Sequence, residues 1–239
     1  MANTIIHKAD SRGYANHGWL KAKHSFSFAN YYNPERMHFG ALRVLNDDYV
    51  EGGMGFGTHP HNNMEIITIP LAGAIEHKDS MSNGTVIKRG DIQVMSAGSG
   101  IMHSEFNHNK NVPLQLLQIW VFPDKKNVEP RYQQIALEEK DYHNKLLQIV
   151  SPHQEDEGVW IHQKAWFNLG NFSGRHQVNY KLKSAENGVY AFVINGSFQI
   201  DGTILSNRDG IGIWNTDGFD FKAMEDNSEI LLMEIPMKF

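Results

Sequence analysis

The sequence of 239 residues contains no cysteine. This absence excludes disulfide bonds, thiolate metal sites and cysteine nucleophiles, and it fits a protein kept in a reducing compartment. If the protein binds a metal, the ligands must come from imidazole and carboxylate groups. The chain carries 13 histidines, so histidine is the residue type to follow.

Long apolar runs and dense basic segments are missing as well. No stretch approaches the length of a membrane-spanning helix, and the opening segment MANTIIHKADSRG lacks the apolar core of a signal peptide. The net charge is -5, and basic residues never run beyond adjacent pairs such as Lys125 and Lys126. Such a chain has no electrostatic footprint for nucleic acid. We therefore expect a cytoplasmic protein that binds neither membranes nor nucleic acid directly.

Helical patterns are scarce, whereas short strand patterns separated by turn residues recur along the chain. Residues 24–28 (HSFSF) and 85–95 (TVIKRGDIQVM) are examples, and this rhythm is typical of an all-β protein. The dipeptide Asn83-Gly84 predicts a hairpin with a type I′ turn, since both central residues of that turn need positive φ. Residues 131–142 (RYQQIALEEKDY) form one of the few segments that predict a short helix.

An internal repeat indicates two similar halves. Residues 69–77 (IPLAGAIEH) and 84–95 (GTVIKRGDIQVM) resemble residues 192–200 (FVINGSFQI) and 202–214 (GTILSNRDGIGIW). In both copies a strand pair turns at a small residue, and a turn containing Gly and Asp precedes a buried strand. The repeat predicts two β-sandwich or barrel units within one chain.

We place the two domains at residues 1–135 and 136–239, with a boundary between about 125 and 150 where a linker belongs. A monomer is the simplest expectation for a chain that carries its own duplicated core. Alignment of the halves puts Leu182 and Ser184 where the first half has histidines, and Glu225 where it has a carboxylate. Because a lone carboxylate does not hold a transition metal, a metal would bind the N-terminal half.

Two short motifs in the first half carry metal-binding residue types. Residues 57–66 read GTHPHNNMEI and residues 96–108 read SAGSGIMHSEFNH. On a helix, positions i and i+2 point away from each other, whereas on a strand they share a face with Cα atoms about 6.6 Å apart. Two such strands can place four ligands around one ion and leave coordination positions open for catalysis. The candidate ligands are His59, His61, His103 and Glu105.

The first motif resembles that of the cupin superfamily, with Gly53, His59, His61 and Glu65 at the expected spacing. The second motif opens at Gly90 but departs from the general cupin pattern. These departures are themselves informative, because five segments within residues 10–135 together resemble the pirin family, and most closely its bacterial quercetin 2,3-dioxygenase-like members. The five segments are HSFSFANYYNP, GALRVLNDD, GFGTHPHNNMEI, SAGSGIMHSE and PRYQQ.

The resemblance implies a bicupin, an all-β protein of two β-barrel or double-stranded β-helix domains with few short helices. The N-terminal domain would hold one metal ion through three histidines and one glutamate, and the C-terminal cupin-like domain would lack a metal site. Iron(II) is the first expectation, while manganese, nickel, copper, cobalt and zinc also suit these ligand types. Carried over to this sequence, the ligands are His59, His61, His103 and Glu105.

One alternative concerns the carboxylate. Glu65 has the same strand parity as His59 and His61 and is the carboxylate that generic cupins use as a ligand. The pirin resemblance favours Glu105. If Glu65 faces inward, we expect it to accept hydrogen bonds beside the ligands.

The function implied by the resemblance is a metal-dependent dioxygenase that cleaves a flavonol such as quercetin with molecular oxygen. In such an enzyme Glu105, beside the bound hydroxyl, is the expected catalytic base, and Glu65 is the alternative. A redox-sensing regulatory protein that acts through protein partners is the alternative. A metal-dependent isomerase or another small-molecule cupin is a third hypothesis.

Several other residues are predicted to have structural roles. His77 and Asp79 are expected to be turn, strand-end or hydrogen-bonding residues with no catalytic part, and His24 is expected to have a structural role. Aromatic residues such as Phe28 and Trp120 are expected to pack mostly in the core, with one or two of them lining a pocket for a flat ligand.

Overall fold

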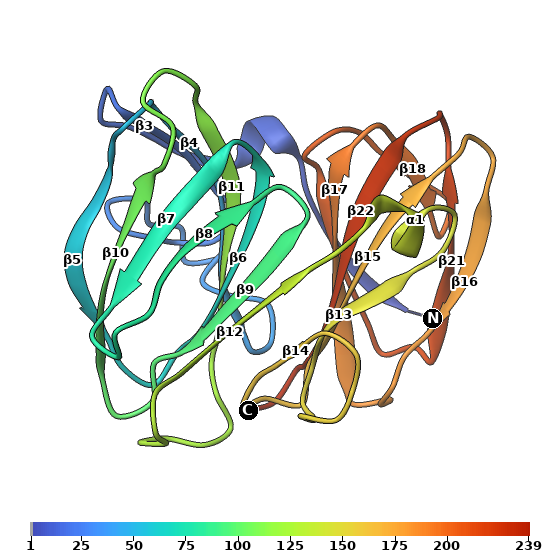
Figure 1. The fold of residues 1–239 in the computed structure, drawn as a ribbon. Coiled ribbons are helices and arrows are strands. Elements are labelled where there is room, and N and C mark those ends of the chain that lie inside the picture. Colours follow the sequence, from blue (N-terminus) through green and yellow to red (C-terminus); the bar gives the residue numbers. More distant parts are fainter. Residues whose placement is uncertain (1) are drawn as a thin grey trace.

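The computed structural model describes residues 2–239 and is almost entirely β. Figure 1 shows two barrel-like halves side by side, one formed by the blue to green part of the chain and the other by the yellow to red part. Each half consists of a seven-stranded sheet and a four-stranded sheet. The predicted bicupin architecture is therefore confirmed. No helix among the described residues is long and apolar enough to span a membrane.

The first half pairs a sheet of order β12-β9-β6-β11-β4-β3-β2 with a sheet of order β5-β10-β7-β8. Its strands are β2 (Gly13–Asn16), β3 (Leu20–His24), β4 (Leu42–Val50), β5 (Gly55–His61), β6 (Glu65–Ala72), β7 (Ala74–Asp79), β8 (Gly84–Lys88), β9 (Asp91–Ser96), β10 (Ile101–Asn107), β11 (Leu114–Val121) and β12 (Arg131–Ala136).

The second half pairs a sheet of order β1-β20-β17-β22-β15-β13-β14 with a sheet of order β16-β21-β18-β19. Its strands are β1 (Asn3–His7), β13 (Leu147–Ser151), β14 (Val159–Trp160), β15 (Trp166–Phe172), β16 (Gln177–Lys181), β17 (Asn187–Asn195), β18 (Phe198–Ile200), β19 (Thr203–Leu205), β20 (Gly210–Trp214), β21 (Gly218–Ala223) and β22 (Ser228–Pro236). The helices are a 3-10 turn at Ala9–Ser11 and α1 (Glu139–Tyr142).

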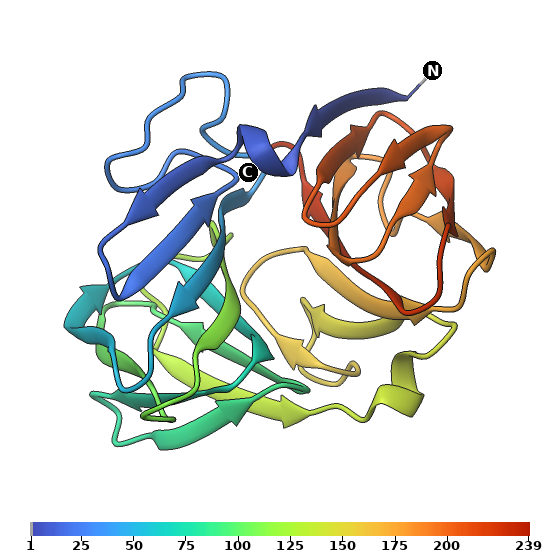
Figure 2. The same ribbon diagram turned by 90° about the horizontal axis from the view of Figure 1, so that it is seen from above.

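The N-terminal strand crosses from one half to the other. Strand β1 pairs antiparallel with β20, with Asn3 opposite Trp214 and His7 opposite Gly210. Figure 2 shows this strand beside the red part of the chain. The sequence does not predict this pairing, because strand partners far apart in the chain leave no local signal. The domain boundary between residues 125 and 150 stays a prediction.

The internal repeat predicted from the sequence has matching strand pairs in the two halves. Strand β6 pairs with β9 and β7 with β8, as β17 pairs with β20 and β18 with β19. The equivalent strand connections turn at Gly73 (φ 78°) and Gly196 (φ 73°), where a side chain would be strained.

Two local predictions need correction. The first half of the predicted helix is strand β12, whose six residues pair with β9, and only Glu139–Tyr142 is helical. These pairings outweigh a weak local helix preference. The hairpin of β7 and β8 is confirmed, but its positive φ lies at Ser82 (72°) rather than at Asn83 and Gly84. The carboxylate of Asp79 explains this, because it accepts hydrogen bonds from the turn.

The largest hydrophobic cluster is shared between the two halves. It joins side chains of the first half, such as Phe26 and Leu45, to side chains of the second, such as Phe167 and Phe192. All four are at most 1% exposed. Burial of this common core stabilises the packing of the two halves against each other.

Candidate metal centre

Two neighbouring strands bring the three predicted histidine ligands together. Strands β5 and β10 pair antiparallel, with His103 opposite His59 and Ile101 opposite His61. Because side chains alternate along a strand, all three imidazoles point to the same side of the sheet. The ring centroids are 4.4 Å apart for His59 and His103, 4.9 Å for His59 and His61, and 4.8 Å for His61 and His103.

The fourth predicted ligand, Glu105, lies on β10 next to an irregularity in the pairing of β10 with β5. The pairing of β10 with β5 is irregular between His103 and Glu105. The Glu105 side chain is buried, and its Oε2 accepts a hydrogen bond of 2.9 Å from Nε2 of Gln118. Potential ligand atoms of Glu105, His103 and His77 all lie within 4.8 Å of one another.

Among residues 2–239, two groups of three side chains have the geometry to hold a metal ion, and both lie in the first half. One group is His59, His61 and His103, and the other is His77, His103 and Glu105. The four ligands predicted from the sequence therefore fall into two overlapping groups that share His103. Two histidines come from the exposed edge strand β5, whereas His103 and Glu105 are buried.

The buried polar atoms of this region fit a metal ion. Both ring nitrogens of His103 and Oε1 of Glu105 have no hydrogen-bond partner in the protein. Each buried polar atom left without a partner costs about 1–3 kcal/mol. A divalent ion would satisfy Oε1 of Glu105 and one ring nitrogen of His103, and a donor set of imidazoles and one carboxylate suits first-row transition metals.

Burial sets the charge states of the candidate ligands in the metal-free protein. Desolvation, with the neighbouring histidines, lowers the pKa of His103 to about 2 and that of His61 to about 4. Both rings are therefore neutral near pH 7, as metal ligands must be. Burial raises the pKa of Glu105 to about 7, against the opposing hydrogen bond from Gln118.

A cavity of about 460 Å³ opens onto the candidate ligands. His59, His61 and Glu105 form one wall, and Trp19, Leu20, Ala22, Phe28, Phe56 and Trp120 supply apolar surface. The ring of Trp120 meets that of His61 edge to face, with centroids 4.9 Å apart and an interplanar angle of 85°. A larger cavity of about 770 Å³ lies near the C-terminus, but no candidate ligand lines it. The ligand-lined cavity is therefore the candidate active site.

Two family models match separate parts of the chain. Residues 6–121 match the family model described as Pirin, and residues 148–235 match the one described as Quercetinase C-terminal cupin domain. The chain is 43% identical over 235 residues to a quercetin 2,3-dioxygenase of Escherichia coli (strain K12), covering 97% of this chain and 98% of that protein.

The chain belongs to the pirin family. It is also 38% identical to a pirin-like protein of Caulobacter vibrioides, covering 94% of this chain and 96% of that protein. The crystal structure of the bacterial pirin YhhW from Escherichia coli in complex with nickel(II) has a TM-score of 0.92 and 40% identity, covering 98% and 99% of the two chains. The predicted relationship to quercetin 2,3-dioxygenases is confirmed at the level of the family.

Glu65, the alternative carboxylate ligand of this pirin, is hydrogen-bonded to another residue. Glu65 is 1% exposed, and its Oε2 accepts a hydrogen bond of 2.6 Å from the hydroxyl of Ser96. Burial raises the pKa of Glu65 to about 7, while the Ser96 bond and the charge of Arg131 lower it. The carboxylate that the fold brings next to His103 is Glu105, and Glu65 belongs to neither three-residue group.

Reasoning from the sequence missed other polar residues that line the cavity. Asp48 on β4 is 4% exposed, and its Oδ1 has no partner. Burial and the nearby charges of Asp47 and Glu105 raise the pKa of Asp48 to about 8. His24, interpreted above as structural, also lines the cavity, and its Nδ1 is 2.8 Å from Oδ1 of Asn46.

Proposed function

We propose that this pirin is a metal-dependent dioxygenase that opens the ring of a flavonol such as quercetin with molecular oxygen and releases carbon monoxide. The observation that carries the proposal is a cavity with aromatic walls that ends at three clustered imidazoles and a buried carboxylate. Relatives named quercetin 2,3-dioxygenase, which match nearly the whole chain, support the same reaction.

The group of His59, His61 and His103 would hold the ion, with Glu105 of the overlapping group as the proposed fourth ligand. When bound, the ion supplies Lewis-acid and oxygen-handling chemistry. Iron(II) remains the first expectation for this chain, and the nickel(II) complex of the Escherichia coli pirin supports nickel as a second choice. Neutral imidazoles and a carboxylate accept either metal.

The cavity walls suit a flat aromatic ligand. Trp19, Phe28, Phe56 and Trp120 offer ring faces and edges that exclude water and fix the plane of such a ligand. Asp48, which lines the same cavity as Glu105, offers an unpartnered carboxyl oxygen that would hydrogen-bond a hydroxyl group. A planar molecule with hydroxyl groups at its edges satisfies both kinds of wall.

Glu105 is the proposed base for the hydroxyl that lies against the ion. Its pKa of about 7 matches the range in which a general base is effective, because proton transfer is most efficient when the pKa lies near the working pH. Gln118 donates to Oε2 and so fixes the carboxylate, leaving Oε1 free to accept the proton. An ion held by Glu105 would lower the basicity of this carboxylate, so Glu105 would act as the base through an oxygen that the ion does not engage.

The test compares two near-isosteric variants, Glu105→Gln and Glu65→Gln, for metal content and for flavonol turnover. We expect Glu105→Gln to lose turnover and Glu65→Gln to keep its metal. Unchanged metal content together with full turnover in Glu105→Gln would rule out the assignment. Stoichiometric metal without oxygen uptake in the wild type would favour the regulatory alternative, in which a partner distinguishes two oxidation states.

A further inference from the structure

A fourth histidine, His77, lies next to the proposed metal ligands His103 and Glu105. Strand β7 pairs with β10 so that His77 lies directly opposite Glu105, and Asp79 directly opposite His103. Directly opposed residues on neighbouring strands project from the same face of a sheet. His77 therefore points to the same side as Glu105, and its ring centroid lies 5.2 Å from that of His103.

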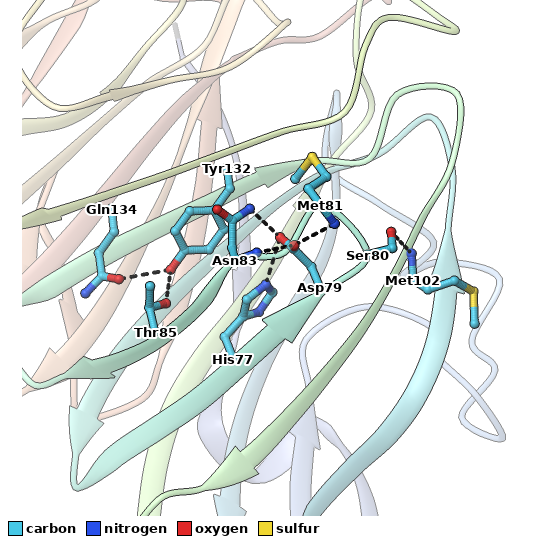
Figure 3. A network of polar contacts seen from close by, with 9 residues as sticks. All are labelled: His77, Asp79, Ser80, Met81, Asn83, Thr85, Met102, Tyr132 and Gln134. Atoms are coloured by element: carbon cyan, nitrogen blue, oxygen red, sulfur yellow. Dashed lines mark hydrogen bonds and ion pairs between the residues drawn. The ribbon is translucent and has the colours of Figure 1, made fainter.

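The ring of His77 is held on two sides (Figure 3). Its Nε2 lies 3.5 Å from Oδ2 of Asp79, a long contact to a carboxylate that is itself fixed. Asp79 accepts hydrogen bonds from the backbone of Met81 and from the backbone and side chain of Asn83. The ring of Tyr132 lies 5.1 Å from that of His77 at an angle of 33°.

The remaining nitrogen of His77 has no partner. His77 is completely buried, and its Nδ1 makes no hydrogen bond in the protein. His103 and Glu105 are 1% and 2% exposed, and each also has unpartnered buried atoms. All three side chains thus carry an unsatisfied polar atom, and their potential ligand atoms lie within 4.8 Å of one another. One shared cation would satisfy all three residues at once.

We propose that His77, His103 and Glu105 form an inner position for a divalent transition-metal ion. Two imidazoles and one carboxylate are a donor set that binds iron(II) and leaves coordination positions open. The contact of His77 with Asp79 supports the proposal, because a metal-binding histidine commonly presents its other ring nitrogen to a carboxylate. This inference deepens the proposed function and rests on it for the identity of the ion.

The centre then has two positions that share His103. The outer position is the group of His59, His61 and His103 at the edge strand, and the inner position is fully buried behind it. Glu105 is then the fourth ligand of an ion at the outer position and one of three ligands of an ion at the inner position. Since both positions use His103, a single ion occupies one position or the other. The inner position explains why a histidine without a hydrogen bond on Nδ1 is tolerated in the barrel interior.

The experiment removes the outer group and asks whether an ion still binds. In the double variant His59→Ala/His61→Ala, cobalt(II) binding is measured by visible absorption and by elemental analysis. We expect one cobalt ion per chain. Addition of His77→Phe to the double variant, or of His77→Gln as a second choice of similar size, should weaken cobalt binding by at least roughly 100-fold, because one of three ligands is lost.

Tyr132→Phe in the same double variant is the matched control. This substitution removes the Tyr132 hydroxyl, which is hydrogen-bonded to Thr85, and leaves the three ligands in place. Cobalt affinity should therefore not change. Circular dichroism and thermal unfolding verify that each variant folds.

A folded double variant that binds no cobalt would overturn the proposal, as would equal affinity with and without His77. Cobalt binding that depends on His77, found together with absent flavonol turnover in the wild type, would instead refute the proposed function and leave the inner position standing.

Discussion

Replacement of Glu105 by glutamine should stabilise the metal-free protein at alkaline pH. The carboxyl is fully buried, and its pKa is raised from 4.5 to about 7, chiefly by desolvation. An acid whose pKa is raised in the folded state does not lower the free energy of unfolding at pH values below its unfolded pKa of 4.5. The loss in the free energy of unfolding grows as the pH rises above 4.5, and it is complete above about pH 7. The difference corresponds to roughly 3 kcal/mol at pH 8.

The assay is thermal unfolding of chelator-treated wild type and Glu105→Gln at about pH 8 and about pH 4. Glutamine keeps the shape of the side chain, and its carbonyl oxygen can still accept from Gln118. Because 1 kcal/mol moves Tm by about 2–4 °C in a chain of this size, the variant should melt roughly 6–12 °C higher at pH 8. Near pH 4 the difference should vanish.

The exposed Glu129→Gln is the control for removing one negative charge, and it should show no pH-dependent gain. In the presence of nickel(II), the wild type should melt at a higher temperature than Glu105→Gln, because the wild type keeps a carboxylate ligand that this variant lacks. Equal melting temperatures of wild type and Glu105→Gln at pH 8, or an equal gap at both pH values, would refute the reasoning from burial.

Three further predictions concern the metal and the fold. Nickel affinity should fall about tenfold per pH unit below pH 7, because Glu105 must release a proton on binding; calorimetry in two buffers measures that proton. Gly98→Ala should destabilise the protein by about 1–3 kcal/mol in urea unfolding, since Gly98 has φ 48° and a Cβ there would clash with the carbonyl oxygen of Val128. Phe192→Ala, in the core shared by both halves, should cost about 3–5 kcal/mol in the same assay.

Strand periodicity carried much of the site prediction. Because side chains on a strand alternate with a period of two, the spacing of His59 and His61 was enough to place them on one face. The family resemblance then supplied the partner strand with His103 and Glu105. The repeat around Gly73 and Gly196 similarly indicated two barrels, and the strand pairing in the two halves matches.

What could not be predicted depends on contacts distant in sequence. Nothing near His77 indicates that β7 pairs with β10 in the register that places this ring beside Glu105. Asp48 joins the cavity through the pairing of β4 with β11, and β1 joins the second half through β20. A histidine or an aspartate read alone is more often structural, so these roles appear only in the folded chain.

The most direct test of the central claim is oxygen uptake with quercetin as a function of metal occupancy, measured after anaerobic purification. Our account predicts that uptake rises in proportion to bound metal, and that His103→Ala abolishes both metal binding and uptake because His103 belongs to both ligand groups. Uptake that persists after complete removal of the metal, or a His103→Ala variant that retains metal and turnover, would contradict it.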